Sequence, residues 1–339
     1  NRHWIMLKKK SKLTSTNNKP SSIGRFLSQE PPNRGGIKMN EFKKRLVHVF
    51  SLETKTAPKL LLLPIVIFLL SLTVFPLIYA ILTSLQYYVL SDPLAKRFVW
   101  LQNYTNMLYD ERFWNSLVNT FHFIAVSLTL EMVLGIIMAL LLARKFLGSG
   151  LAKTLLLLPT ITTPVVVGLI WIMLYDPQFG LINYLLVELG FHPQAWLDSE
   201  KSAMWALIIV DVWEWTPFVA LVLLAGLQSL PVEPYEAAMV DGASPFQRFI
   251  HLTLPLLKPY LIIAFLIRFM DAFRWFDTIY IMTKGGPGTA TETVNMYGYL
   301  TGFNFLNMGY AATLGITMLV LITIISTLVV KTAQKGDSP

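Results

Sequence analysis

The chain has 339 residues, of which 54% are hydrophobic and 14% are charged, and its mean hydropathy of +0.53 favours an integral membrane protein over a soluble domain. The absence of cysteine excludes disulfides, thiolate metal sites and a cysteine nucleophile, and the five scattered histidines do not suggest a metal centre, so no metal site is expected. The net charge of +8 does not predict nucleic-acid binding, because the basic residues gather at the N-terminus and beside apolar runs.

The N-terminal part of the chain is expected to lie outside the membrane. Residues 1–38 are polar, basic and rich in Ser, Asn, Pro and Gly, which predicts a disordered tail. Residues 39–59 are expected to form a juxtamembrane segment. In this segment an amphipathic membrane-surface helix is the alternative to a plain positively charged flank.

Six apolar stretches are each long enough to cross a hydrocarbon layer of about 30 Å as a helix. Because the strict alternation of barrel strands is absent, we predict an all-α integral membrane fold with six transmembrane helices. They make up a transmembrane domain over residues 60–331, followed by a short tail over residues 332–339. The predicted spans are Leu60–Ile81, Leu117–Leu142, Leu151–Tyr175, Ala203–Leu230, Tyr260–Met282 and Met308–Val330.

The distribution of positive charge predicts the orientation of these spans. Of the 28 Lys and Arg residues, 21 fall on the side of the two termini, 5 on the opposite side and 2 within the fifth span. Counted from Met39 onward the bias is still 12 to 5. Cytoplasmic loops carry the excess of Lys and Arg, so both termini are expected in the cytoplasm of a multi-pass protein in the lipid bilayer.

The second predicted span contains a glutamate, and the third contains prolines and threonines. Glu131 in the second span could be a lone polar packing contact or a contact to a substrate. Pro159 and Pro164, with three threonines between them, predict a kinked third span whose freed carbonyl groups line a cavity.

Residues 232–259, between the fourth and fifth spans, are too long for an unstructured connection and are expected to fold. Pro234 suits a first helical turn, and Gly242 stands where a left-handed C-terminal cap is needed. Ser244 and Gln247 have the spacing of a capping box around Pro245. This pattern predicts two short helices that meet at a glycine, an elbow on the cytoplasmic side.

The end of this elbow is expected to be marked by proline. Pro255 and Pro259 should limit its continuation into the fifth span, because the residue before a proline is driven away from helical geometry.

Polar and aromatic residues within the fourth and fifth spans are candidates for a carbohydrate pathway, because sugars present hydroxyl rims and apolar faces. The acids of the fifth span that lie three residues from an Arg could instead form ion pairs with that Arg, and this alternative carries the same weight. The pathway candidates are Asp211, Trp213, Glu214, Arg268, Asp271, Arg274, Trp275 and Asp277.

The loop contains Glu236-Ala237-Ala238, then Gly242, Leu252 and Leu254-Pro255. This order resembles the EAA loop of the membrane subunits of ATP-binding-cassette importers, with Leu252 in place of the usual Ile. The stretches "LPTITTPVVVGLIW" (158–171), "LQSLPVEPYEAA" (227–238) and "TKGGPGTATET" (283–293) resemble the carbohydrate-importer permeases related to the maltose and glycerol-phosphate systems.

The resemblance implies a type I importer permease whose elbow is a coupling helix, docked in a cleft of a separate ATPase subunit. Partners implied in the same way are a second homologous permease subunit, two ATPase subunits that bind ATP and Mg, an extracytoplasmic substrate-binding protein and a carbohydrate, all at a bacterial or archaeal cytoplasmic (inner) membrane. The implied coupling residues are Glu236, Ala237, Ala238, Asp241, Gly242, Ala243, Arg248 and Pro255.

The chain shows no Gly-x-x-x-x-Gly-Lys-[Ser/Thr] loop, so we expect no nucleotide site, no bound cofactor and no enzymatic activity of its own. A sugar or oligosaccharide is favoured over a polyol or glycerol-phosphate. Two alternatives remain open: a multispanning membrane enzyme acting on glycolipid through Asp211 and Glu214, and an ion-coupled secondary transporter, which would normally show two related halves.

Overall fold

The computed structural model describes residues 57–144 and 146–335. The predictions for residues 1–38 and for most of 39–59 therefore lie outside the described residues. The chain divides into two compact units, residues 1–72 and 73–339. In the first unit, the described residues belong to helix α2 (Ala57–Ser84), which continues into the second and contains the predicted first span.

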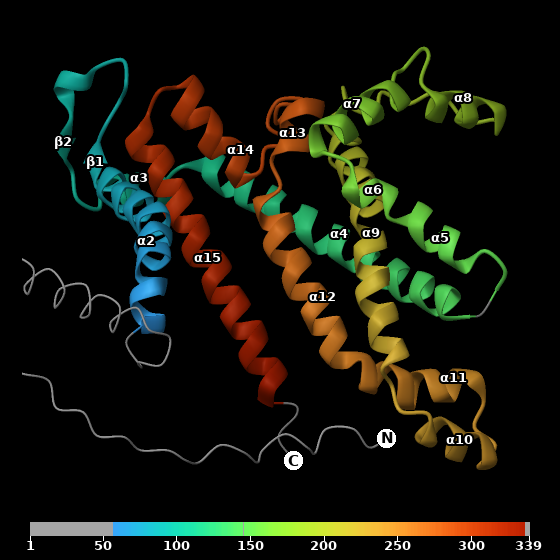
Figure 1. Ribbon diagram of the computed structural model, residues 1–339. Coiled ribbons are helices and arrows are strands. Elements are labelled where there is room, and N and C mark those ends of the chain that lie inside the picture. Colours follow the sequence, from blue (N-terminus) through green and yellow to red (C-terminus); the bar gives the residue numbers. More distant parts are fainter. Residues whose placement is uncertain (1–56, 145, 336–339) are drawn as a thin grey trace, which may run out of the picture. The chain divides into compact units, whose positions relative to one another are not determined.

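The second unit is built on four long helices, α4 (Glu111–Ala143), α9 (Ala203–Gln228), α12 (Leu254–Arg274) and α15 (Met308–Lys335) (Figure 1). They include the predicted second and sixth spans and the fourth up to Gln228, two residues short of its predicted end, and α15 continues beyond the predicted boundary at residue 331. Within the described residues, five helices including α2 are long and apolar enough to cross a membrane, or six if one bent pair counts as a single span.

That bent pair is the predicted third span, and it breaks more sharply than the kink we expected. Helices α5 (Ser149–Leu156) and α6 (Leu158–Ile161) are followed by α7 (Pro164–Leu174) after a bend of 95°. Thr162 and Thr163 have extended backbones with ψ near 140°. Pro164 drives the residue before it out of helical geometry, so the helix ends and a new one begins.

The predicted fifth span has different bounds in the structure. Helix α11 (Pro245–Arg248) runs through a π-helical turn (Phe249–Thr253) directly into α12. The predicted stop at Pro255 and Pro259 is therefore wrong: both lie within α12. Pro255 occupies its first turn, where a missing N–H costs little.

At its other end the predicted fifth span is interrupted. Helix α12 ends at Arg274, the backbone of Trp275 is extended with ψ 122°, and the separate helix α13 (Asp277–Met282) follows. Helix α13 packs against α7, where Gly168 allows Ile281 to approach closely.

Shorter elements complete the second unit. A two-stranded antiparallel hairpin qualifies the all-α prediction: β1 (Gln86–Tyr87) pairs with β2 (Arg97–Phe98). The remaining elements are a 3-10 turn (Pro93–Ala95), α3 (Gln102–Leu108), α8 (Leu181–Glu188), α10 (Glu233–Val240), α14 (Val294–Tyr299) and a second π-helical turn (Leu300–Asn304).

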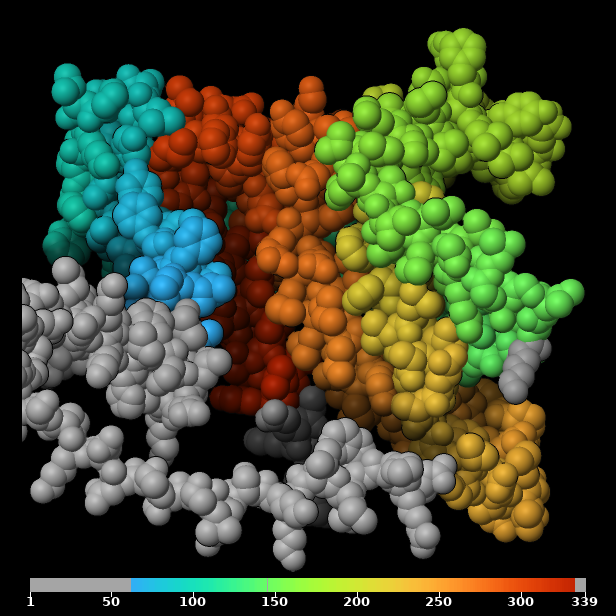
Figure 2. Space-filling model, in the orientation of Figure 1, coloured from blue at the N-terminus to red at the C-terminus, as the bar shows by residue number. Residues whose placement is uncertain are grey.

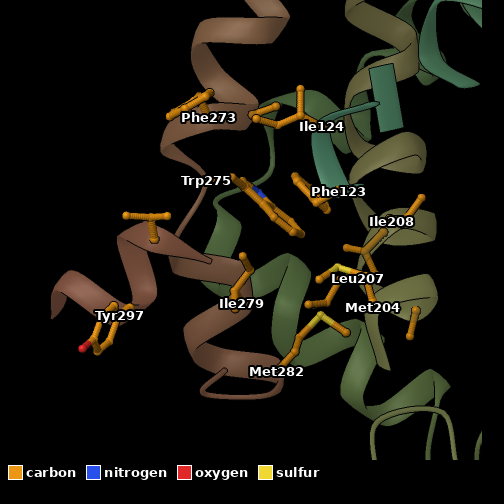
Figure 3. Close-up of a cluster of buried hydrophobic side chains, with 14 of the residues drawn as sticks. Phe123, Ile124, Met204, Leu207, Ile208, Phe273, Trp275, Ile279, Met282 and Tyr297 are labelled. Atoms are coloured by element: carbon orange, nitrogen blue, oxygen red, sulfur yellow. The ribbon is translucent and has the colours of Figure 1, made fainter. Parts of the chain in front are cut away.

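The main hydrophobic core lies where α4, α9 and the α12–α13 break meet (Figure 3). Phe123 stacks on Trp275 with ring centroids 4.7 Å apart and planes at 6°. Leu207, Ile208 and Ile279 are buried in the same cluster. Burial of these large apolar side chains fixes the position of the interrupted helix.

A glycine sets the distance between α9 and α12. A Cβ on Gly226 would lie 2.6 Å from Cγ of Tyr260 and 2.9 Å from Cδ1 of Leu257. We expect Gly226→Ala to lower the melting temperature of the purified protein, by an overpacking cost of about 1–3 kcal/mol. Gly315→Ala is the control, because no atom lies within 4 Å there and alanine favours a helix interior. Equal melting temperatures for the two variants would contradict this packing.

Candidate functional site

Three ionisable side chains from three helices meet in the interior of the second unit. The guanidinium of Arg268 on α12 donates from Nε and Nη2 to the two carboxylate oxygens of Glu131 on α4, at 2.7 and 2.8 Å. Its Nη2 also donates to both oxygens of Asp211 on α9, at 3.1 Å. All three side chains are at most 1% exposed. We refer to Glu131, Asp211 and Arg268 as the buried triad.

Further polar groups surround the buried triad. The guanidinium of Arg268 lies 4.5 Å from the ring centroid of Trp215. Glu214 is also buried, and its Oε2 has no hydrogen-bond partner among the described residues. The hydroxyl of Thr160 on α6 donates to the backbone carbonyl of Glu214 at 2.7 Å. The broken third span is thereby attached to α9 beside the triad.

The pairing predicted within the fifth span is only partly correct. Arg268 does not pair with Asp271, because its buried guanidinium turns away to the two carboxylates on α4 and α9. A buried charge requires full compensation, which the half-buried Asp271 on the same helix does not give. Asp271 instead pairs with Arg274 at 3.0 Å, on the surface. No ion pair between Arg274 and Asp277 occurs in the described part of the chain.

The structure divides the eight pathway candidates into two groups. Asp211, Glu214, Arg268 and Trp275 are buried within the chain. The second group is exposed or half-buried and comprises Trp213, Asp271, Arg274 and Asp277.

Glu131 was missed as an ion-pair partner. The sequence contained one relevant signal: a carboxylate within an apolar helix needs a counter-charge, and cations within the predicted spans are rare.

The elbow has the predicted local geometry. Helix α10 ends at Val240, and Gly242, two residues later, has φ +78°, the left-handed conformation that favours glycine. Helix α11 begins with a complete capping box, in which the backbone N–H of Ser244 donates to Oε1 of Gln247 at 2.8 Å. The glycine and the capping box are therefore confirmed, whereas a coupling role for the elbow is not tested by them.

The elbow is held in place and presents apolar side chains outward. The hydroxyl of Tyr235 on α10 donates to Oγ1 of Thr253 in the π-helical turn at 3.1 Å. Val240 is 88% exposed and Phe246 71% exposed. Figure 1 shows α10 and α11 at one end of α9 and α12, with α13 and α14 at the opposite end.

The coupling residues implied by the sequence lie along this elbow and the start of α12. Glu236, Ala237, Asp241, Gly242 and Pro255 are exposed. The remaining three are half-buried: Ala238, Ala243 and Arg248.

At the end opposite the elbow, the loop between α13 and α14 is fastened to α4. Arg112 donates from Nε and Nη2 to the carboxylate of Glu292 at 2.8 and 2.6 Å. The side-chain amide of Asn119 donates to the carbonyl of Thr289 at 2.9 Å. Charge-assisted bidentate pairs of this kind are among the stronger side-chain contacts. The loop therefore presents a fixed surface.

Close to the ion pair of Arg112 with Glu292, Asp110 caps the start of α4. Its carboxylate accepts hydrogen bonds from the hydroxyls of Tyr297 and Tyr310 and from the backbone N–H of Arg112. Burial raises the pKa of Asp110, but these hydrogen bonds outweigh burial and hold the pKa below its usual value of 3.8.

Because the pKa of Asp110 is depressed in the folded state, its contribution to stability is present above the unfolded pKa and is lost as the pH falls through the folded pKa. We expect Asp110→Asn to lower the melting temperature near pH 7, and this deficit to shrink below about pH 3.8. Melting curves of both proteins across this range provide the measurement. A deficit that stays constant with pH would contradict the role of the ionised carboxylate.

The chain is similar in sequence to membrane components of known transport systems. The family described as "Binding-protein-dependent transport system inner membrane component" matches residues 131–335. The trehalose/maltose transport system permease protein MalF of Thermococcus litoralis is 40% identical over 268 residues, covering 79% of this chain and 89% of that protein. The trehalose transport system permease protein SugA of Mycobacterium tuberculosis is 34% identical over 283 residues, covering 83% and 90%.

Solved structures show a similar fold. A bacterial ABC transporter involved in the import of the acidic polysaccharide alginate contains a chain that matches with a TM-score of 0.72, covering 89% of this chain and 100% of that one. Its sequence identity is 20%, so the similarity concerns the arrangement of helices.

Proposed function

The chain belongs to the family of inner membrane components of binding-protein-dependent transport systems, and from that premise we propose how it moves its substrate. It is an integral inner membrane protein and the permease subunit of a carbohydrate ABC importer.

The elbow docks into a cleft of a separate ATPase subunit, with Val240 and Phe246 entering the cleft and the small residues Ala237 and Ala238 allowing close approach. The observation that carries this assignment is a fixed pair of capped helices that exposes apolar side chains at one end of the long helices. An exposed apolar patch on a rigid element is typical of a protein interaction site.

Movement of the elbow is transmitted to the spans by helix continuity. Helix α11 leads through the π-helical turn into α12 without a loop, so a displacement of the elbow displaces Arg268 as well. The buried triad then carries the displacement to α4 and α9. Closure of two ATPase subunits, which bind ATP and Mg, would in this way switch the pathway between its two openings.

The topology that fits this role has six spans, with the broken third span counted as one. Both termini and the elbow lie in the cytoplasm, in agreement with the charge bias. The opposite end faces an extracytoplasmic substrate-binding protein, and a second homologous permease subunit completes the pathway. The relatives named for trehalose and maltose support a sugar or oligosaccharide substrate over a polyol or glycerol-phosphate.

The substrate route is assigned to the exposed and half-buried candidates Trp213, Asp271, Arg274 and Asp277. Trp213 packs edge-to-face against Trp171 with centroids 5.6 Å apart, and this contact would hold its ring as a platform for a sugar face. The buried candidates hold the helices together instead. Asp211 is committed to Arg268, which also disfavours the alternative of a membrane enzyme with Asp211 as a proton donor or acceptor.

Uptake by vesicles containing the complete complex tests the substrate and its route. We expect saturable uptake of labelled trehalose or maltose, with competition from other oligosaccharides and little from glycerol or glycerol-phosphate. Trp213→Ala should reduce uptake because it removes an aromatic platform, and Asp271→Ala because it removes a carboxylate that accepts hydrogen bonds from sugar hydroxyls. Trp100→Ala is the control for the loss of an exposed Trp, in the loop before α3. Full uptake by both pathway variants would contradict the assigned route.

A further inference from the structure

Helix α8 turns apolar side chains outward and an amide inward. Its exposed stripe contains Leu181, Tyr184 and Leu185, at the spacing of one helical face, and ends at the exposed Glu188; Tyr184 is 61% exposed. Its inner side carries Asn183, which is 3% exposed, together with the half-buried Ile182 and Leu186. A helix in water turns its apolar residues inward and its amide outward. The opposite arrangement is typical of a helix whose outer face meets lipid.

The exposed stripe is held rigidly, because Asn183 acts as a clamp. Its Oδ1 accepts from the backbone N–H of Gln194 and from Nε1 of Trp196, both at 3.0 Å, and its Nδ2 donates to the carbonyl of Gln194 at 3.0 Å. Trp196 in turn packs against Tyr175 with centroids 5.2 Å apart. The apolar face is therefore a permanent feature of the fold and does not result from a loosely attached segment.

The apolar surface extends beyond the helix. Phe179, Leu189 and Phe191 in the adjoining turns are 63–89% exposed. Glu188 is the one residue with a full charge between residues 178 and 194. Protein docking surfaces normally have a polar rim and are enriched in Arg. A wide, nearly uncharged and aromatic surface fits the boundary between lipid headgroups and acyl chains better.

The place of α8 in the fold agrees with such a boundary. It lies between α7 and the start of α9, at the end of the spans opposite the elbow (Figure 1). In Figure 2 the yellow-green residues of this segment project at the upper right, beyond the side of the molecule. Their exposed surface continues from that of α7, where Leu169, Ile170 and Met173 are also exposed. The apolar surface of the spans therefore extends into α8.

We propose that α8 and its adjoining turns form an anchor in the headgroup–acyl boundary of the leaflet opposite the elbow. Leu181, Tyr184 and Leu185 face the acyl chains, and Glu188 marks the end of α8 that emerges among the headgroups. The anchor holds the short helix α7 and the start of α9 at a fixed depth. This inference concerns lipid contact and holds whether or not the elbow docks on an ATPase.

Spin labels can measure this lipid contact directly, because the chain has no cysteine of its own. Single variants Leu181→Cys, Leu185→Cys, Glu188→Cys and Asp198→Cys would be labelled in the full complex, reconstituted in vesicles of phosphatidylcholine and phosphatidylglycerol. Collision rates with oxygen, which concentrates in acyl chains, and with a water-soluble nickel chelate would then be compared at each site.

The expected oxygen-to-nickel ratio is several times higher at residues 181 and 185 than at the exposed control residue 198, with residue 188 between them. Two other results would overturn the proposal. A ratio at 181 and 185 equal to that at 198 would place the helix in water. Low collision rates with both reagents would place a protein, such as a second subunit or a binding protein, over the stripe.

Discussion

Replacing Arg268 with Met is expected to lower the free energy of unfolding by about 3–5 kcal/mol, because it leaves the carboxylates of Glu131 and Asp211 buried without compensation. Both carboxyl groups are buried, and among the described residues their hydrogen bonds come from the guanidinium of Arg268. Three helices, α4, α9 and α12, meet at these contacts. Reversible unfolding of the purified protein in mixed micelles by increasing denaturing detergent would give the free-energy difference.

Arg274→Met provides the matched control for the loss of an arginine from the same helix. The pair of Arg274 with Asp271 is at the surface, with the arginine side chain 66% exposed. Surface pairs contribute about 0–1 kcal/mol, so little stability should be lost. Equal losses from the two variants would contradict the structural importance of the buried triad.

A compensated variant separates the loss of charge balance from the loss of packing. Combining Arg268→Met with Glu131→Gln and Asp211→Asn removes all three charges while nearly preserving side-chain volume. We expect this triple variant to recover part of the lost free energy, because neutral amides are less costly to bury than unpaired carboxylates. A triple variant less stable than Arg268→Met would show that the carboxylates are stabilised by something other than the guanidinium.

The features that sequence predicted well are those that local chemistry decides. The capping box at Ser244 depends on residues three apart, and the left-handed backbone of Gly242 depends on a single residue. The long apolar runs of α4, α9 and α15 likewise carry their own signal in length and composition.

The features that sequence reasoning missed depend on contacts between distant segments. The partners of Arg268 come from positions 57 and 137 residues away, and helical spacing favoured Asp271 instead. The break at Trp275 accompanies the stacking of its ring on Phe123 of α4, which no pattern within the fifth span announces. Pro255 was interpreted as a stop, although a first-turn position tolerates proline.

Replacing Gly242 with Val is expected to cost the complex most of its substrate-stimulated ATP hydrolysis. A β-branched residue at φ +78° is strained by about 1–2 kcal/mol. Relief of this strain would change the orientation of α10 relative to α11. Since 1.4 kcal/mol corresponds to a factor of ten, loss of about 1–2 kcal/mol of docking energy gives about a 5- to 30-fold weaker coupling. Hydrolysis would be measured with and without sugar-loaded binding protein.

Gly148→Val is the matched control for this strain. Gly148 has φ +86° with no atom within 4 Å of its added Cβ, as at Gly242, but it lies between α4 and α5, outside the elbow. It should retain stimulated hydrolysis. Loss of stimulation in both variants, or in neither, would contradict a specific coupling role for the elbow.

Cross-linking from the elbow tests the proposed docking most directly. Val240→Cys and Phe246→Cys would each carry the single thiol of the chain, and a thiol-attached benzophenone would be photoactivated in the assembled complex. We expect a covalent product of this chain with the ATPase subunit from both positions, and none from Phe303→Cys, which is exposed at the opposite end (Figure 1). An ATPase product from residue 303, or its absence at 240 and 246 in an active complex, would contradict docking of the elbow on the ATPase.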